Sequence, residues 1–184
     1  MKKFIAMLFV VCIVFSLCAC GSSSGESLTF ATGGESGTYY AFGSVLAQYV
    51  SNNTDLKVTA VVGNGSQANV EDLDSGAVQL GFCQSDVMSY AYSGTNLFAE
   101  SGAVGSFSVA AALYMEQVQI VTTNPDIKTV EDLKGKTVSI GALGSGVYFN
   151  AVDVLGVYGI DAEKDITPVY QSFGDSADSL KDGK

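Results

Sequence analysis

The fold is decided by the stretch Gly33-Gly34-Glu35-Ser36-Gly37-Thr38-Tyr39-Tyr40. It follows the apolar run Leu28–Ala31 and precedes a segment whose apolar residues recur at helical spacing. This order predicts a strand, a glycine-rich turn and then a helix, with Thr38 as the N-cap. Because the first N–H groups of a helix are free and its dipole is positive there, a small anion could bind at this turn.

The same arrangement recurs twice more along the chain. The run Val58–Val62 leads into Gly63-Asn64-Gly65-Ser66, and Val138–Ile140 leads into the turn Gly141–Gly146. A single glycine turn has many uses. Three such turns, each placed after an expected strand, predict a binding cleft.

From Leu28 onward the pattern alternates between strand and helix, which indicates an α/β fold with a largely parallel sheet. The further expected strands are Lys57–Val62, Gln79–Phe82, Thr137–Ile140 and Ile166–Tyr170. The further expected helices are Ser66–Ser75, Ser85–Tyr92, Thr129–Leu133, Val147–Tyr158 and Ser172–Leu180.

Two extended runs, Val109–Tyr114 and Gln117–Thr123, are expected to form a crossover between two lobes. We place the first α/β lobe at residues 28–115 and the second at residues 116–184. The second lobe would hold only two or three strands, which is few for independent stability. The sequence therefore predicts a second lobe that is truncated.

The chain begins with a basic segment, Met1-Lys2-Lys3, followed by the apolar run Phe4–Ala19. This run is shorter than the roughly 20 residues of a membrane span, although an uncleaved anchor helix is the alternative. The segment Leu17-Cys18-Ala19-Cys20-Gly21 resembles a bacterial lipobox, which implies cleavage before Cys20 and lipidation of its thiol. Residues 1–19 are thus expected to be a lipoprotein signal peptide, and residues 20–27 the lipidated cysteine with a flexible tether.

Composition restricts the chemistry of the protein. The net charge is −10, so nucleic acid is not an expected partner, and the membrane is expected to be reached through the lipid alone. The sequence has no histidine and no arginine, which excludes a Ser-His-Asp triad, a histidine zinc site and an arginine clamp. We expect no enzyme activity, no cofactor and no metal site.

Cys83 is the one cysteine that would remain after the signal peptide is removed and Cys20 is lipidated. We expect it at the end of a buried strand and not as a reactive thiol.

Two of the glycine turns could bind a nucleotide or a phosphate, so an enzyme is the alternative function. Gly63–Ala68 fits the dinucleotide pattern G-x-G-x-x-A, but the next expected strand ends at Cys83-Gln84 without the acidic residue that this fingerprint needs. Gly141–Gly146 could cradle a phosphate, whereas Leu143 breaks the G-x-S-x-G pattern around Ser145. A secreted structural or adhesive module is a third possibility.

The segment Gln84-Ser85-Asp86 lies where an expected strand ends and a helix begins. Ser85 or Asp86 is expected to cap this helix, and the segment is also expected to face the cleft.

Several short motifs, in order, resemble those of the TAXI family of solute receptors, which serve TRAP-type secondary transporters. The matching segments are Gly37-Thr38-Tyr39-Tyr40, Gly65-Ser66-x-x-Asn69, Leu80-Gly81-Phe82-x-Gln84-Ser85-Asp86, Val130–Lys136 and Gly141-Ala142-x-Gly144-Ser145-Gly146. Together they extend over nearly all of Leu28–Lys184. The family often has Pro at position 143 and Thr at position 147, where this chain has Leu143 and Val147, which leaves the identity of the ligand open.

The resemblance implies a two-lobed Venus-flytrap fold of the periplasmic-binding-protein type II kind. It also implies a lipid-anchored extracytoplasmic receptor that captures a small carboxylate, a dicarboxylate or an acidic amino acid, and delivers it to TRAP-type permease subunits. The expected ligand-binding residues are Gly37, Thr38, Tyr39, Ser66, Asn69, Gln84, Asp86, Ser145, Gly146 and Val147.

Overall fold

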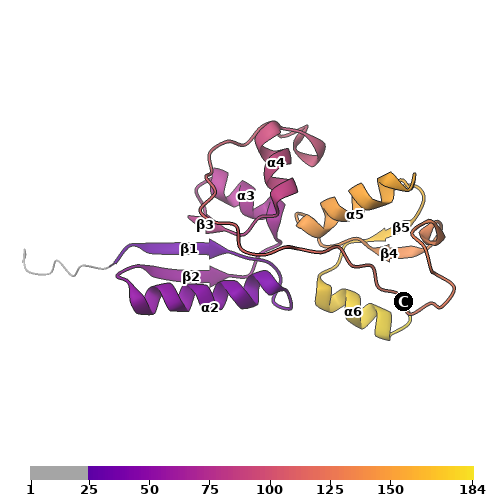
Figure 1. Ribbon diagram of the computed structural model, residues 1–184, viewed down its shortest axis with the longest axis horizontal. Coiled ribbons are helices and arrows are strands. Elements are labelled where there is room, and N and C mark those ends of the chain that lie inside the picture. The colour runs from indigo at the N-terminus through magenta and orange to yellow at the C-terminus, as the bar shows by residue number, and fades with distance from the viewer. Residues whose placement is uncertain (1–24) are drawn as a thin grey trace, which may run out of the picture.

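Strand β1 (Ser27–Ala31) is the central strand of a parallel sheet with the order β2-β1-β3. The computed structural model describes residues 25–184 (Figure 1). In register, Ser27 lies beside Lys57 of β2 (Lys57–Val61), and Phe30 lies beside Leu80 of β3 (Leu80–Gly81). The expected signal peptide, Cys20 and most of the tether lie outside the described residues.

Helices cover both faces of this sheet (Figure 1). Helix α2 (Thr38–Asn53) packs on one face, where Ala47 is buried with Phe30 and Phe82. Helices α3 (Ser66–Asp74) and α4 (Ser85–Ser93), with the short 3-10 helix η1 (Asn96–Phe98), lie on the other face. The predicted strand–helix alternation is confirmed here to within a few residues at each end.

The second sheet contains two parallel strands in the described chain, β4 (Thr137–Ser139) and β5 (Thr167–Val169). Helix α5 (Gly146–Val157) connects them, helix α6 (Phe173–Lys181) follows β5, and the 3-10 helix η2 (Glu131–Leu133) precedes β4. Within residues 25–184, none of the helices has the length and apolar character that crossing a bilayer needs.

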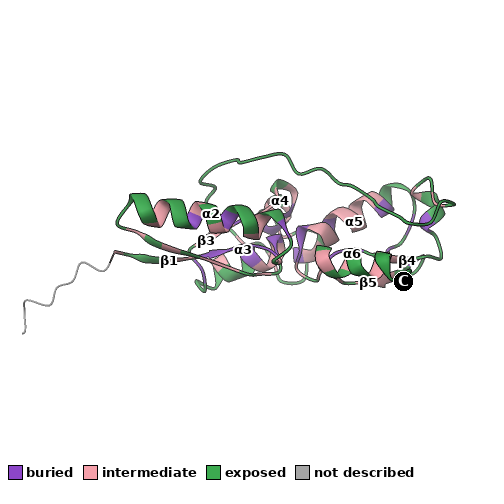
Figure 2. Ribbon diagram, turned by 90° about the horizontal axis from the view of Figure 1, so that it is seen from below, coloured by how far each residue is buried: buried purple, intermediate pink, exposed green. Residues whose placement is uncertain are grey.

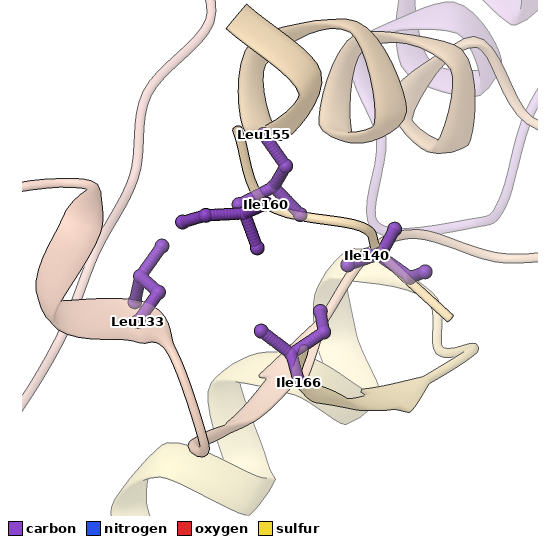
Figure 3. Packing of buried hydrophobic residues seen from close by; sticks show 6 residues of the cluster. Leu133, Ile140, Leu155, Ile160 and Ile166 are labelled. Atoms are coloured by element: carbon purple, nitrogen blue, oxygen red, sulfur yellow. The ribbon is translucent and has the colours of Figure 1, made fainter. Parts of the chain in front are cut away.

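The core of the second lobe is a small aliphatic cluster. Figure 3 shows the side chains of Leu133, Ile140, Leu155, Ile160 and Ile166 pointing toward one another, from η2, α5 and the loops that follow β4, follow α5 and precede β5. Each of these side chains is at most 7% exposed. Burial of apolar side chains from several elements is what holds so small a sheet in place.

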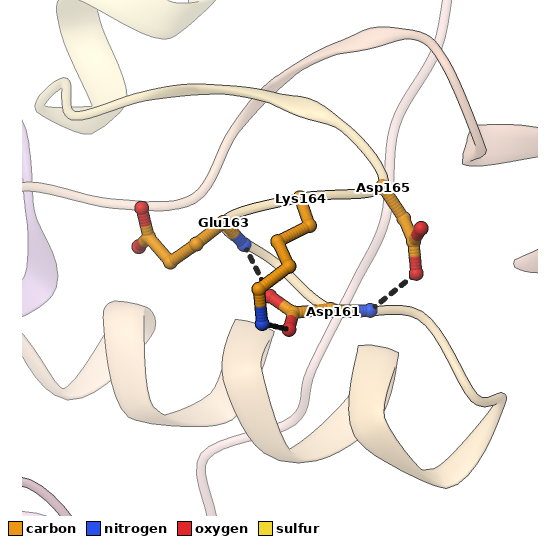
Figure 4. Close-up of polar contacts among 4 residues, drawn as sticks. All are labelled: Asp161, Glu163, Lys164 and Asp165. Atoms are coloured by element: carbon orange, nitrogen blue, oxygen red, sulfur yellow. Dashed lines mark hydrogen bonds and ion pairs between the residues drawn. The ribbon is translucent and has the colours of Figure 1, made fainter.

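The turn between α5 and β5 is stabilised by hydrogen bonds and an ion pair among its own residues (Figure 4). Lys164 Nζ lies 2.5 Å from Asp161 Oδ2, and the Asp161 N–H donates to Asp165 Oδ2 at 2.9 Å. The hydrogen bond from Lys164 lowers the pKa of Asp161, with a further contribution from the Glu163 N–H. Both side chains of the ion pair are exposed, so the pair orders the turn but adds little stability.

The segment 108–126 joins the two lobes and is exposed at every residue, as Figure 2 shows. The crossover between two lobes was expected in this segment. The two extended runs within it, however, form no strand and pair with no strand of the described chain. The boundary between residues 115 and 116 falls inside this segment, where no element marks it, and stays a prediction.

The capping predictions were wrong. Gly37 is the N-cap of α2, and Thr38 is the first helical residue with an exposed side chain. Gln84 is the N-cap of α4, so that Ser85 and Asp86 already lie in its first turn. In each case the extended backbone of the preceding residue decides where the helix begins, because the N-cap has non-helical dihedral angles.

Candidate functional site

The glycine turns meet at the junction of the two lobes. The arrows of β1 and β2 point toward the second lobe in Figure 1, so the loops after them lie at the carboxyl edge of the sheet. There the Gly63 N–H donates to Gly33 O at 3.1 Å, and the Gln84 N–H donates to Ser66 Oγ at 3.1 Å. This is the edge at which open α/β sheets bind ligands.

The N-terminus of α3 is occupied by a carbonyl of the other lobe. The N–H groups of Gln67 and Ala68 donate to Gly144 O at 3.0 and 3.1 Å. Gly65 precedes this helix with φ +104°, a conformation that favours glycine, and a Cβ there would lie 3.4 Å from Ser145 Cα. The free N–H groups at the start of α3 thus face a partially negative oxygen supplied by the protein itself.

The N-terminus of α5 faces the first lobe. Ser145 is its N-cap, is 7% exposed, and accepts the Tyr148 N–H on Oγ at 3.2 Å. Gly146 is buried so closely that a Cβ would overlap the side-chain amide of Gln84 and lie 2.8 Å from Ser66 Oγ. The structure therefore brings four of the predicted residues together: Ser66, Gln84, Ser145 and Gly146.

Polar side chains of α4 and α5 connect the lobes. Gln84 Nε2 donates to Asn150 Oδ1 at 2.7 Å, and Asn150 Nδ2 donates to Asp86 Oδ2 at 2.9 Å. Further along, the Tyr90 hydroxyl donates to Asp153 Oδ2 at 2.8 Å. This hydrogen bond is the main cause of the raised pKa of Tyr90.

An apolar contact between the lobes accompanies these bonds. Phe149 of α5 is fully buried against residues of α3, α4 and η1, in a cluster with Val70, Val87, Ala91 and Phe98. Its ring stacks on those of Tyr90 and Phe98 at centroid distances of 5.9 and 6.0 Å. Aromatic contacts of this kind add stability beyond their buried area.

The remaining predicted site residues have other surroundings. Asn69 is 1% exposed, and its Nδ2 donates to Thr32 O at 2.9 Å and Phe82 O at 2.8 Å. It therefore links the ends of β1 and β3 and presents no donor to the junction. Val147 lies half-buried beside Gly141, where a Cβ on Gly141 would overlap it. Gly37 is buried, and a Cβ there would lie 3.6 Å from the Phe173 ring.

Tyr39 and Cys83 are half-buried at the same junction. Burial is the largest cause of the raised pKa of each, and it raises the pKa of the Cys83 thiol to about 12, with a further contribution from the charge of Asp86. The thiol therefore stays protonated and is a poor nucleophile at neutral pH, which agrees with the prediction for Cys83.

A comparison with known proteins places the chain in a family. The model of the NMT1-like family matches residues 30–184. The chain belongs to the NMT1-like family.

A similar solved structure confirms the fold. The NMT1-like chain is similar to the alkanesulfonate-binding protein SsuA from Xanthomonas axonopodis pv. citri bound to MOPS, with a TM-score of 0.52 and 21% identity over 88% of this chain and 53% of that one. The periplasmic aliphatic sulphonate binding protein SsuA from Escherichia coli gives a TM-score of 0.48 and 21% identity over 86% of this chain and 51% of that one. The predicted α/β fold of type II periplasmic binding proteins is therefore confirmed, and the chain spans about half the length of these proteins.

Two residues of the junction in this NMT1-like chain, Asn150 and Asp153, were not predicted from the sequence. Asn150 and Asp153 lie three residues apart on an otherwise apolar helix, on the face that continues from Gly146. This spacing was the available signal in the sequence.

Proposed function

We propose that this chain is an extracytoplasmic solute receptor, held to the membrane by a lipid on Cys20, that captures a small carboxylate and delivers it to a TRAP-type permease. Membership of the NMT1-like family and the periplasmic-binding-protein fold support the receptor part of this proposal. The ordered TAXI-like motifs, above all Gly37–Tyr40 and Gly141–Gly146, support the TRAP-type partner and the carboxylate. The lipobox-like segment Leu17–Gly21 supports the anchor.

One observation carries the proposal: the N-termini of α3 and α5 meet between the lobes. Two N–H groups of α3 converge on the Gly144 carbonyl, at 3.0 and 3.1 Å. A ligand carboxylate oxygen can take the place of that carbonyl when the lobes separate, because both are hydrogen-bond acceptors and the helix dipole favours the negative one. We therefore propose the position of the Gly144 oxygen as the site of the ligand anion.

The chemistry of the residues favours binding over catalysis. The sequence contains neither histidine nor arginine, and the Cys83 thiol has a pKa of about 12. An enzyme with a dinucleotide or phosphate ligand is the alternative function. The carboxylate of Asp86, next to Gln84 at the start of α4, disfavours a doubly charged phosphate at this edge.

Thermal unfolding of the full chain with a panel of ligands tests the proposal. Small carboxylates should raise the midpoint, because a ligand that binds only the folded state stabilises it by about 2.7 kcal/mol at a concentration one hundred times its Kd. Stabilisation by nucleotides but not by carboxylates would favour the enzyme instead.

A pair of serine variants locates the anion. Ser145 and Ser172 are both N-caps that accept a backbone N–H at 3.2 Å, so each Ser→Ala change removes a comparable cap. Ser145→Ala should weaken carboxylate binding about tenfold in calorimetric titration, since a hydrogen bond to a charged group contributes roughly 1.5–3 kcal/mol. Ser172→Ala should leave affinity unchanged. Equal affinity in both variants would place the anion elsewhere.

A further inference from the structure

A cavity of about 340 Å³ lies along helix α5, and this volume is within the range of small-molecule sites. Tyr148, Val152 and Gly156 line one side of it, and because they are four residues apart they form a single stripe of the helix. Leu97 of η1 lines the cavity from the first lobe. The cavity extends away from the N-terminus of α5, since Gly156 lies about 15 Å along the helix from Gly146.

The lining of this cavity is largely apolar, and Gly156 keeps it open. A Cβ added to Gly156 would meet no heavy atom within 4 Å, so a larger side chain there would project into free space. Ile160 and Ala162 also line the cavity and are only 2% and 6% exposed. The body of a ligand in this cavity would therefore contact apolar atoms on both sides.

The charge at the edge of the cavity is negative. Glu163 lines it and accepts two hydrogen bonds on Oε1, from the Tyr170 hydroxyl at 2.7 Å and from the Tyr148 hydroxyl at 3.3 Å. Asp161 also lines the cavity, but Lys164 pairs with it and balances its charge. Figure 4 shows the Glu163 carboxylate pointing away from this ion pair, so Lys164 does not neutralise it.

The end of α5 adds to the negative potential. The carbonyl groups in the last turn of a helix carry a partial negative charge, and the last turn of α5 contains no basic residue. Asp153, next to Val152, adds a second carboxylate, which accepts the Tyr90 hydroxyl at 2.8 Å. The Tyr148 ring can in addition attract a cation through its π-electrons. An apolar cavity with these groups around it matches an apolar ligand that carries one positive charge.

We propose that this cavity is a second binding site, for a small organic cation that has an ammonium group on a short aromatic or aliphatic body. The ammonium group would lie beside Glu163, and the body would lie against Val152 and Gly156. The ligand is opposite in charge to the carboxylate proposed above and occupies a different place, so this inference does not rest on the proposed function. Because the cation would contact both Leu97 of the first lobe and α5 of the second, its binding would also favour the packed arrangement of the lobes.

Titration of the full chain with 2-phenylethylammonium and with 2-phenylethanol, followed by amide NMR signals, tests this assignment. The two probes share an aromatic body and differ in charge. The ammonium should bind at least about fivefold more tightly, and the signals that move should be those of Leu97 and residues 148–163. Glu163→Gln keeps the size of the side chain and an acceptor oxygen for the tyrosines. It should weaken ammonium binding about fivefold and leave binding of the alcohol unchanged.

A second variant, Gly156→Leu, should prevent binding of both probes because its side chain fills the cavity. The matched controls are Glu100→Gln, which removes the same charge from an exposed position, and Val157→Leu, which enlarges a neighbouring side chain that is 84% exposed. Both controls should bind the ammonium like the parent. Equal binding of the two probes, or ammonium binding that either Glu163→Gln or Gly156→Leu leaves unchanged, overturns the inference. Signals that move only outside the cavity, or no binding at millimolar concentration, overturn it as well.

Discussion

Gly146→Ala should destabilise the protein even though alanine is the better helix former. Gly146 is the first residue of α5, and a Cβ there would overlap the Gln84 amide and approach Ser66 Oγ to 2.8 Å. Gln84 must then leave its place and give up its 2.7 Å hydrogen bond to Asn150. Loss of that bond costs about 0.5–1.5 kcal/mol, and crowding in a packed site typically costs about 1–3 kcal/mol. The helix propensity of alanine returns at most about 1 kcal/mol.

We therefore expect Gly146→Ala to lower the free energy of unfolding by about 0.5–3.5 kcal/mol. Gly156 is the matched control, because it lies in the same helix with no heavy atom within 4 Å of an added Cβ. Gly156→Ala should raise the free energy of unfolding by about 0.5–1 kcal/mol. Urea unfolding followed by far-ultraviolet circular dichroism measures both, since the chain has no tryptophan to serve as a fluorescent probe.

The reasoning is refuted if the two variants are equally stable, because the lobes would then not approach each other at Gly146 in solution. A double variant locates the cause. Gln84→Ala removes the side chain that the new Cβ would meet, so adding Gly146→Ala to it should cost less than the same change costs in the parent. An unchanged cost would assign the effect to Ser66 or to the backbone instead.

Three other changes test separate parts of the molecule. Phe149→Ala should lower the free energy of unfolding by about 3–5 kcal/mol because Phe149 is fully buried between the lobes, whereas Val157→Ala, at a side chain 84% exposed, should change it by less than about 0.5 kcal/mol in the same urea experiment. Asp132 accepts two backbone N–H groups at 2.9 Å, which lowers its pKa, so its stabilisation is present above its ordinary pKa and is lost as pH falls through the lowered one. Asp132→Asn should therefore reduce the unfolding midpoint most at neutral pH, and a difference that grows toward acid would contradict this. Cys20→Ser should abolish lipid attachment, which mass spectrometry of the membrane fraction reports directly; a lipidated variant would show that the lipobox interpretation is wrong.

Local patterns in the sequence determined most of the elements of the fold. Each strand is a short apolar run that ends at a glycine or polar turn, and each helix has apolar residues at helical spacing, so periodicity alone located them. The same local signals predicted the glycine turns that meet at the lobe junction, since a turn after a strand must lie at the carboxyl edge of a parallel sheet. The helix starts were less predictable, because backbone geometry and not the nearest hydroxyl group made Gly37 and Gln84 the N-caps.

The tertiary structure alone decided which polar groups meet across the lobes. Asn69 matched a family motif, but packing directs its amide to the backbone carbonyls of Thr32 and Phe82, just after β1 and β3. Asn150 matched no motif, yet it reaches Gln84, which is 66 residues earlier in the chain. Contacts over such separations depend on how two lobes pack, and no local pattern of residues encodes them. The sequence thus determined the elements and their turns, whereas the packing of α5 and the crossover against the first lobe determined the chemistry of the junction.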